Sequence, residues 1–171
     1  MDIREVIRDV PDFPQPGILF RDITPVLDNP TAFQAALDGL SDLIASADYD
    51  KFVALESRGF LFGAPLSVQL QKGLVLLRKA GKLPGETEAE TYALEYGEAT
   101  IEMHKDALSP GEKVIVIDDL LATGGTARAA GNLVQKLGAQ VVAYLFLVEL
   151  EDLAGRRLLT DAPVLSLVQY S

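Results

Sequence analysis

Two adjacent carboxylates, Asp118 and Asp119, follow the apolar run Val114–Ile117 and precede the small-residue turn Ala122–Thr126. The β-branched run is typical of a parallel strand buried on both faces. The turn leads into a segment of helical periodicity, and the free N–H groups of a helix N-terminus favour an anion such as phosphate. The neighbouring carboxylates repel each other unless they meet a partner, for which sugar hydroxyls or a hydrated metal ion are suitable. We predict a ligand site here, although an ordinary strand–helix turn with acidic caps stays open.

Three other segments carry residues that could bind an anion or a flat ring. Glu56, Ser57 and Arg58 follow the apolar strand segment 52–55 and precede a helical pattern, so this strand end should share a sheet edge with the first site. The basic, Gly- and Pro-punctuated stretch 78–86 fits a mobile lid over an anionic ligand, or a solvated loop. Phe20, beside Arg21, could stack on a planar base or simply pack beside a surface cation. His104 lies in a polar stretch, and we assign it no role.

The elements that must position these residues alternate between strands and helices. Asp2 can cap a short helix through Val10, and the prolines of 11–17 predict an extended surface crossing. We expect strands near 52–55, 74–77, 91–96, 99–103, 114–117, 140–148 and 164–167, and helices near 30–47, 61–70, 127–137 and 153–159. This order predicts an α/β fold with a doubly wound, mainly parallel sheet flanked by helices. Residues 1–171 should form one domain, with a small N-terminal hood at about 1–30 and a flexible lid hairpin at about 78–97.

Composition excludes several classes of function. The net charge of −10 opposes binding to nucleic acid or to an anionic membrane surface. No cysteine and only one histidine are present, which excludes disulfides, thiolate metal sites and histidine clusters. The N-terminus lacks the pattern of a signal peptide, and no apolar run approaches the roughly 20 residues that span a bilayer. We therefore expect a soluble cytoplasmic protein.

The strand, the Asp-Asp pair and the TGGT turn resemble the phosphoribosyl pyrophosphate signature of the type I phosphoribosyltransferases. Neither a Walker loop nor a dinucleotide fingerprint is present. Five segments, PGILFRDITP, ESRGFLFG, RKAGKLPGE, LEYG and VIVIDDLLATGGTA, together with the terminal LSLVQY, span nearly the whole chain in order. As a set they resemble the adenine-specific branch of this family.

The resemblance implies conversion of adenine and phosphoribosyl pyrophosphate to AMP and pyrophosphate, with Mg²⁺ held by substrate oxygens and water rather than by protein ligands. It implies roles for the following residues. Phosphate and ribose would bind at Asp118, Asp119, Ala122, Thr123, Gly124, Gly125 and Thr126; pyrophosphate at Glu56, Ser57, Arg58, Arg78, Lys79 and Lys82; adenine at Leu19, Phe20, Arg21 and Arg58. Glu95 matches the family's proton acceptor, and Arg58 is assigned with it to catalysis. The neighbours Leu94 and Tyr96 suggest that the Glu95 carboxyl is partly sheltered, and a structural role in which Glu95 pairs with a lid cation such as Arg78 stays open. The family also implies a homodimer across which Arg78 could act, and often a cis peptide near Ser57.

Two alternatives share the phosphate signature. A sister enzyme for guanine, hypoxanthine or orotate should lack the LFRD and LEYG segments, which this chain has. A regulator that senses phosphoribosyl pyrophosphate and binds nucleic acid would need a basic face or an added DNA-binding domain. Neither feature is visible in this acidic sequence.

Overall fold

A computed structural model describes all residues 1–171, and its centre is a seven-stranded sheet. The strand order is β5-β6-β4-β3-β7-β8-β9, and β4, β3, β7, β8 and β9 run parallel to one another. The bounds are β3 Lys51–Leu55, β4 Gly73–Lys79, β5 Thr87–Ala93, β6 Glu98–His104, β7 Lys113–Leu121, β8 Gln140–Leu150 and β9 Val164–Tyr170. At one edge, β6 runs antiparallel to β4 and also to β5, with which it forms a hairpin. The predicted α/β class and mainly parallel sheet are confirmed.

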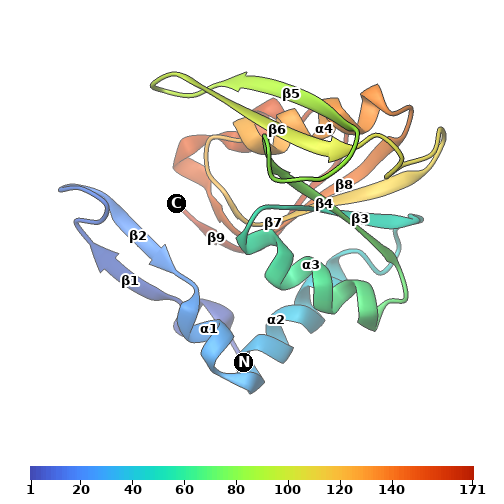
Figure 1. Cartoon of the computed structure of the whole chain (residues 1–171). Coiled ribbons are helices and arrows are strands. Elements are labelled where there is room, and N and C mark those ends of the chain that lie inside the picture. Colours follow the sequence, from blue (N-terminus) through green and yellow to red (C-terminus); the bar gives the residue numbers. More distant parts are fainter.

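Helices cover both faces of this sheet, which divides the core into two layers (Figure 1). Helices α2 (Pro30–Leu43) and α3 (Arg58–Gln69) pack on one face, and α4 (Gly125–Lys136) packs on the other. The central strand explains why the sheet needs both covers, because Val114–Ile117 of β7 have no exposed surface. No helix of the structure has the length and apolar character needed to cross a bilayer.

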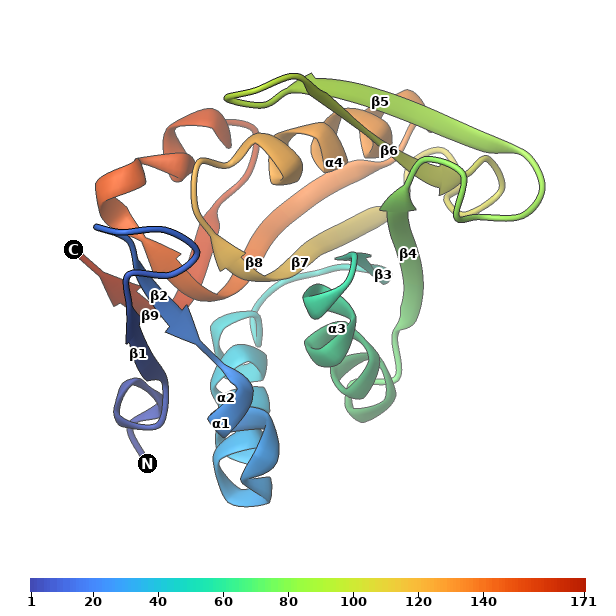
Figure 2. The ribbon, with the colours of Figure 1, turned by 60° about the vertical axis from the view of Figure 1, so that its left-hand side comes forward.

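The N-terminal residues form a hairpin that stands apart from the main sheet (Figures 1 and 2). Strands β1 (Arg8–Pro11) and β2 (Leu19–Asp22) pair antiparallel. Two sequence predictions are wrong here. The expected N-terminal helix is a single 3₁₀ turn at Ile3–Glu5, capped by Asp2, because Val10 pairs with Phe20 in the hairpin instead. Pro11 ends β1 opposite Leu19, and Pro14 and Pro16 lie in the hairpin's loop rather than in an extended crossing.

Other element boundaries shift by a few residues. A short helix α1 (Thr24–Asp28), which the sequence analysis did not predict, follows β2 and places Val26 in the core. Helix α2 begins as expected, because the Asn29 side chain accepts from the N–H groups of Thr31 and Ala32. It ends at Leu43 rather than near Ala47. The expected helix at 153–159 is two 3₁₀ turns, Glu151–Leu153 and Gly155–Leu158.

Candidate active site

The carboxyl ends of β3 and β7 lie side by side, since Ala54 of β3 is in register with Ile117 of β7. Arg58, the first residue of α3, reaches across and donates from Nε to Oδ2 of Asp119 at 2.6 Å. Gly59 permits this approach, because a Cβ there would lie 2.9 Å from the Ile117 carbonyl oxygen. The structure thus brings together the two polar strand ends that the sequence placed on one edge.

Strand β7 is longer than the apolar run predicts, so Asp118 and Asp119 lie within the strand and not beyond it. Asp119 is buried, with 5% exposure, and Asp118 is half-buried. The Asp118 Oδ1 accepts a hydrogen bond from the Asp119 backbone N–H at 2.8 Å. Burial and the neighbouring Asp119 carboxylate raise the pKa of Asp118 well above its ordinary value. Arg58 is the partner that the Asp119 charge needs, whereas Asp118 lacks a cation of its own.

The turn after β7 forms a small hollow at the N-terminus of α4. A cavity of about 90 Å³ is lined by Asp118, Leu120, Leu121, Ala122, Thr123, Gly124, Gly125, Thr126, Ala127 and Phe146. Gly124 is the N-cap, with φ of +87°, and no side chain caps the helix. The first N–H groups of α4 are therefore available to an anion. All five predicted turn residues, 122–126, line this hollow.

The Gly155–Leu158 turn packs against the turn 122–126 that lines this hollow. A Cβ on Gly124 would lie 2.5 Å from the Gly155 carbonyl oxygen, and a Cβ on Gly155 would lie 2.2 Å from the Ala122 carbonyl oxygen. Arg156 holds this turn by donating to both carboxylate oxygens of Glu149 at 2.6 Å. The Arg156 hydrogen bonds outweigh the effect of burial and lower the pKa of the nearly inaccessible Glu149.

A larger cavity of about 330 Å³ adjoins Asp119 and separates the N-terminal hairpin from the sheet. Its lining consists of Phe13, Phe20, Arg21, Asp22, Ile23, Thr24, Arg58, Asp119, Leu120 and Val148. Phe20 makes an edge-to-face contact with Phe13, with ring centroids 5.2 Å apart. Phe20, Arg21 and Arg58 line the cavity as expected, whereas the exposed Leu19 does not. Phe13, Leu120 and Val148 were missed, because only the folded hairpin brings them to Phe20.

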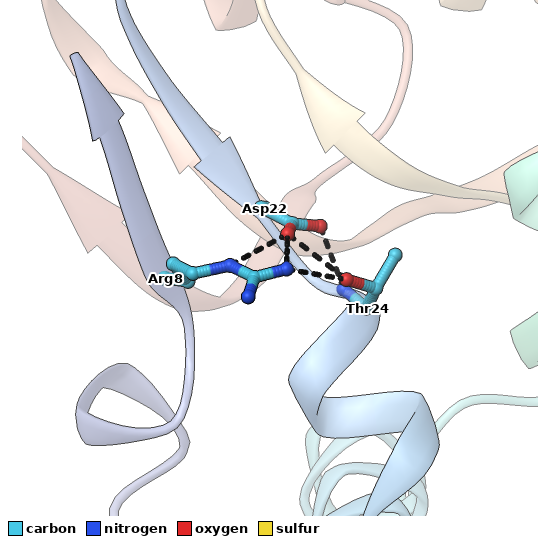
Figure 3. A network of polar contacts seen from close by, with 3 residues as sticks. All are labelled: Arg8, Asp22 and Thr24. Carbon is cyan, nitrogen blue, oxygen red and sulfur yellow. Dashed lines mark hydrogen bonds and ion pairs between the residues drawn. The ribbon is translucent and has the colours of Figure 1, made fainter.

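A polar network fixes the base of the N-terminal hairpin (Figure 3). Arg8 of β1 donates to Asp22 Oδ2 from Nε at 3.0 Å and from a terminal nitrogen at 2.6 Å. Thr24 donates to Asp22 from its backbone N–H and its hydroxyl, both at 2.9 Å. The Thr24 N–H and the Arg8 guanidinium hold the pKa of Asp22 below its usual range. The network joins β1, β2 and the start of α1, so it sets where the cavity wall stands.

The Glu56 carboxylate, just after β3, meets groups from β4 and from the loop that follows it. The Glu56 carboxylate accepts from the Lys79 backbone N–H and lies 3.5 Å from an Arg78 guanidinium nitrogen. Burial would raise the pKa of Glu56, but the Lys79 N–H and the charges of Arg78 and Lys82 lower it. The peptide bond between Glu56 and Ser57 is cis, as the resemblance implied. Ser57 is the N-cap of α3 and makes no capping hydrogen bond, so a second helix N-terminus faces this edge uncapped.

The predicted lid is only partly a loop. Residues 80–86 are irregular, but 87–93 form β5, which docks on α4 through a Glu90–Lys136 ion pair of 2.6 Å. Tyr92 of β5 is hydrogen-bonded to Thr126 at 2.9 Å, which links the hairpin to the turn 122–126. Glu95 lies in the turn 94–97, which the Leu94 N–H to Gly97 carbonyl bond closes.

The expectation that Glu95 is partly sheltered is wrong. Its neighbours Leu94 and Tyr96 are 49% and 87% exposed, Glu95 is itself exposed, and its side chain makes no hydrogen bond or ion pair. The alternative role as an anchor for Arg78 has no support, because Arg78 pairs with Glu56 instead.

Comparisons with known proteins agree on one family. Residues 22–168 match the phosphoribosyl transferase domain. The adenine phosphoribosyltransferase of Carboxydothermus hydrogenoformans is 52% identical over 99% of this chain and 100% of its own. The chain belongs to the adenine phosphoribosyltransferase family.

Solved members of the family have the same fold. The adenine phosphoribosyltransferase of Thermoanaerobacter pseudethanolicus superposes with a TM-score of 0.95 at 47% identity, covering 98% of each chain. That of Saccharomyces cerevisiae gives 0.91 at 44% identity and covers 96% of each chain. The yeast enzyme was crystallised with adenine and D-2,5-dideoxy-2,5-imino-altritol 1,6-bisphosphate, an iminosugar bisphosphate.

Proposed function

We propose that this chain transfers the phosphoribosyl group of phosphoribosyl pyrophosphate to adenine, forming AMP and releasing pyrophosphate in purine salvage. One observation carries the proposal. Two uncapped helix N-termini, those of α3 and α4, and an aromatic-lined cavity meet at one edge of the sheet around Arg58 and Asp119. The helix N-termini suit the two phosphate-bearing ends of the sugar substrate, and the cavity suits a planar base between them.

The sugar phosphate would bind along the end of β7. The backbone of 122–126 and the hydroxyls of Thr123 and Thr126 surround the hollow for the 5′-phosphate. Asp118 lines this hollow and Asp119 lines the adjoining cavity, where their carboxylates can accept hydrogen bonds from the ribose hydroxyls. Their charge also lies where the ribose carbon becomes positive as pyrophosphate leaves.

Pyrophosphate would bind beside Glu56. The backbone N–H groups of 57–58 at the N-terminus of α3 can donate to it, and the charges of Arg78, Lys79 and Lys82 are available on β4 and the following loop. Closure of the lid residues 78–97 would exclude the water that could otherwise capture the reactive sugar cation. Glu56 of the same chain lies 3.5 Å from an Arg78 guanidinium nitrogen, which supports a place for Arg78 beside this pyrophosphate site.

Adenine would lie between Phe20 and Arg58 in the 330 Å³ cavity. The ring of Phe20 and the planar guanidinium of Arg58 offer two flat faces, and backbone groups around Leu19 and Arg21 can read the edge of the base. The ring nitrogen of adenine forms the new bond to the ribose carbon and gives up its proton, for which we propose Glu95 as the acceptor. Because Glu95 is exposed, this role requires the hairpin turn to move over the base.

Magnesium fits this arrangement as a substrate-bound ion. No group of three or more acidic or imidazole side chains forms a dedicated metal site, and Asp119 is engaged by Arg58. Asp118 is the carboxylate left to orient a hydrated ion. Magnesium retains water and binds well through one or two carboxylates plus substrate phosphates. When bound, it would neutralise charge on the departing pyrophosphate.

We also propose a homodimer in the cytoplasm. The outer side of α3 exposes Leu61 and Val68, at 42% and 80%, and the adjoining β4 exposes 39% of Leu76. An exposed apolar surface of this kind supports association with a second copy.

The reaction's sugar substrate is a polyanion that cannot cross a bilayer unaided. The enzyme must therefore share a compartment with this substrate, which supports the proposed cytoplasmic location.

Asp118→Asn is expected to lower kcat/KM for phosphoribosyl pyrophosphate by about 10- to 100-fold, as for loss of a charged hydrogen-bond partner. It should not lower the melting temperature. The pKa of Asp118 is raised in the folded protein, so its ionised form opposes folding at neutral pH and Asn removes that cost. Asn also keeps the oxygen that accepts from the Asp119 N–H. Kinetics and thermal unfolding check both statements, and normal turnover would remove Asp118 from the ribose site.

The double variant Lys79→Gln/Lys82→Gln should raise KM for phosphoribosyl pyrophosphate, and the difference from the unchanged protein should shrink as salt concentration rises. The Lys79 and Lys82 charges lie at the carboxyl edge of the sheet. Lys113→Gln is the matched control, because it removes a lysine charge from the opposite edge. Lys113 begins β7 at the opposite edge and pairs with the exposed Asp48. An equal effect in the control, or one insensitive to salt, would show that these lysines do not contact the substrate.

A further inference from the structure

The C-terminal segment LSLVQY has no role in the reaction as described, yet its last aromatic residue reaches the N-terminal hairpin. Tyr170 ends β9, the edge strand of the main sheet, and Figure 2 shows this end of β9 beside β1 and β2. The Arg21 guanidinium lies over the Tyr170 ring, 3.8 Å from its centroid, and that of Arg4 lies 5.0 Å away. Arg4 also donates to the Gln169 carbonyl oxygen. These are cation–π contacts between the hairpin region and the sheet.

Arg21 is held in place from a second direction. Its guanidinium forms an ion pair with Asp9 across the hairpin, and only 17% of its side chain is exposed. Arg21 lies between Phe20 and Asp22, and all three residues line the cavity. Because side chains alternate along a strand, Phe20 and Asp22 share one face of β2 and the Arg21 guanidinium occupies the other. Fixing Arg21 on the outer face therefore fixes how far Phe20 stands from Arg58.

The hairpin needs such a link, because its two strands form a separate sheet without hydrogen bonds to the seven-stranded one. Where β2 ends, the network of Arg8, Asp22 and Thr24 joins the hairpin to α1 (Figure 3). The contact with Tyr170 joins it to the sheet whose β7 and β8 supply the opposite cavity wall, through Asp119 and Val148. We propose that Tyr170 is a positioning residue for the base, holding Arg21 so that Phe20 faces Arg58 at the spacing of a purine ring.

This inference rests on the proposed adenine pocket and extends it to a residue outside the pocket. Tyr170 acts through Arg21 and does not line the cavity itself. Its removal should therefore affect adenine more than phosphoribosyl pyrophosphate, which binds at the turn 122–126 and near Glu56. The expected loss is the size of one partly buried cation–π contact, an increase of about 3- to 30-fold in KM for adenine.

The test is steady-state kinetics of AMP formation by the full chain carrying Tyr170→Leu, Tyr170→Phe, Phe20→Ala or Lys72→Met. Tyr170→Leu should raise KM for adenine, with kcat and KM for phosphoribosyl pyrophosphate nearly unchanged. Tyr170→Phe should restore the adenine KM, because it keeps the ring. Lys72→Met is the control, since it removes a different cation–π contact, 4.8 Å from the Tyr49 centroid. Phe20→Ala tests the pocket itself.

Each other result has a distinct meaning. If Phe20→Ala raises the adenine KM and Tyr170→Leu does not, the positioning role is wrong while the pocket stands. If neither variant changes it, the proposed pocket is wrong. If Tyr170→Leu lowers kcat and both affinities together with the melting temperature, Tyr170 is merely structural and the proposal fails.

A double-mutant cycle supplies the second, independent readout. In an Arg21→Met background, Tyr170→Leu should add no further rise in the adenine KM, because the contact is already lost. Full additivity of the two effects would show that Tyr170 does not act through Arg21.

Discussion

Gly124→Ala is expected to lower kcat/KM for phosphoribosyl pyrophosphate by about 10²–10³-fold, the scale of losing a preorganised backbone donor, with little change in KM for adenine. Gly124 has φ of +87°, which an L side chain rarely adopts, and it caps α4 where the turn forms its hollow. A Cβ would also lie 2.5 Å from the Gly155 carbonyl oxygen, whose turn Arg156 and Glu149 hold in place. Backbone N–H groups of the turn must therefore shift away from the 5′-phosphate.

Gly111→Ala is the matched control for this substitution. Gly111 has nearly the same φ, +85°, but a Cβ there meets nothing within 4 Å, and it lies before β7 at the far edge of the sheet. The control separates backbone strain from the steric effect at the turn. Equal kinetics in the two variants would mean that the shape of 122–126 does not decide phosphate binding.

Glu95→Gln is expected to reduce kcat by about 10²–10⁴-fold, the usual contribution of a positioned general base, while both KM values stay close to those of the unchanged protein. Gln keeps the shape of the side chain and loses the proton acceptor. Steady-state rates at saturating concentrations of both substrates measure the effect, because kcat and KM then separate chemistry from binding. Glu98→Gln is the control, since Glu98 is an exposed carboxylate just beyond the same turn.

Near-normal saturated turnover in Glu95→Gln would show that another group takes the proton. The exposed position of Glu95 makes this a demanding test, because the side chain reaches the base only if the turn 94–97 moves. A structural role is already disfavoured by the absence of any Glu95 ion pair.

The parts of the site that could be predicted from sequence are those built from local segments. Within residues 113–126, the β-branched run predicts a strand and the glycine turn predicts the start of a helix, with two carboxylates between them. These features do not depend on contacts with distant parts of the chain. The sequence also predicted that the ends of β3 and β7 lie side by side, since parallel strands place their carboxyl ends at the same edge of a sheet. The Arg58–Asp119 ion pair is the result.

The N-terminal hairpin could not be predicted in the same way. Ile3, Val6, Ile7 and Val10 have helical spacing, but β1 gains its hydrogen bonds from β2, which places Asp9 opposite Arg21. Local periodicity does not report such a partner. Phe13 and Val148 line the same cavity although 135 positions separate them, so only the fold reveals them. The exposure of Glu95 likewise depends on where the hairpin turn stands, not on its apolar neighbours.

The most direct measurement is nucleotide formation from phosphoribosyl pyrophosphate and Mg²⁺ with adenine, hypoxanthine or guanine supplied in turn at equal concentration. The account predicts AMP formation with a kcat/KM on the order of 10⁴ above that for either 6-oxo purine, because edge contacts made for a 6-amino group leave polar groups unpaired with the others. Comparable rates of nucleotide formation from hypoxanthine and from adenine would contradict the assignment of this chain to adenine.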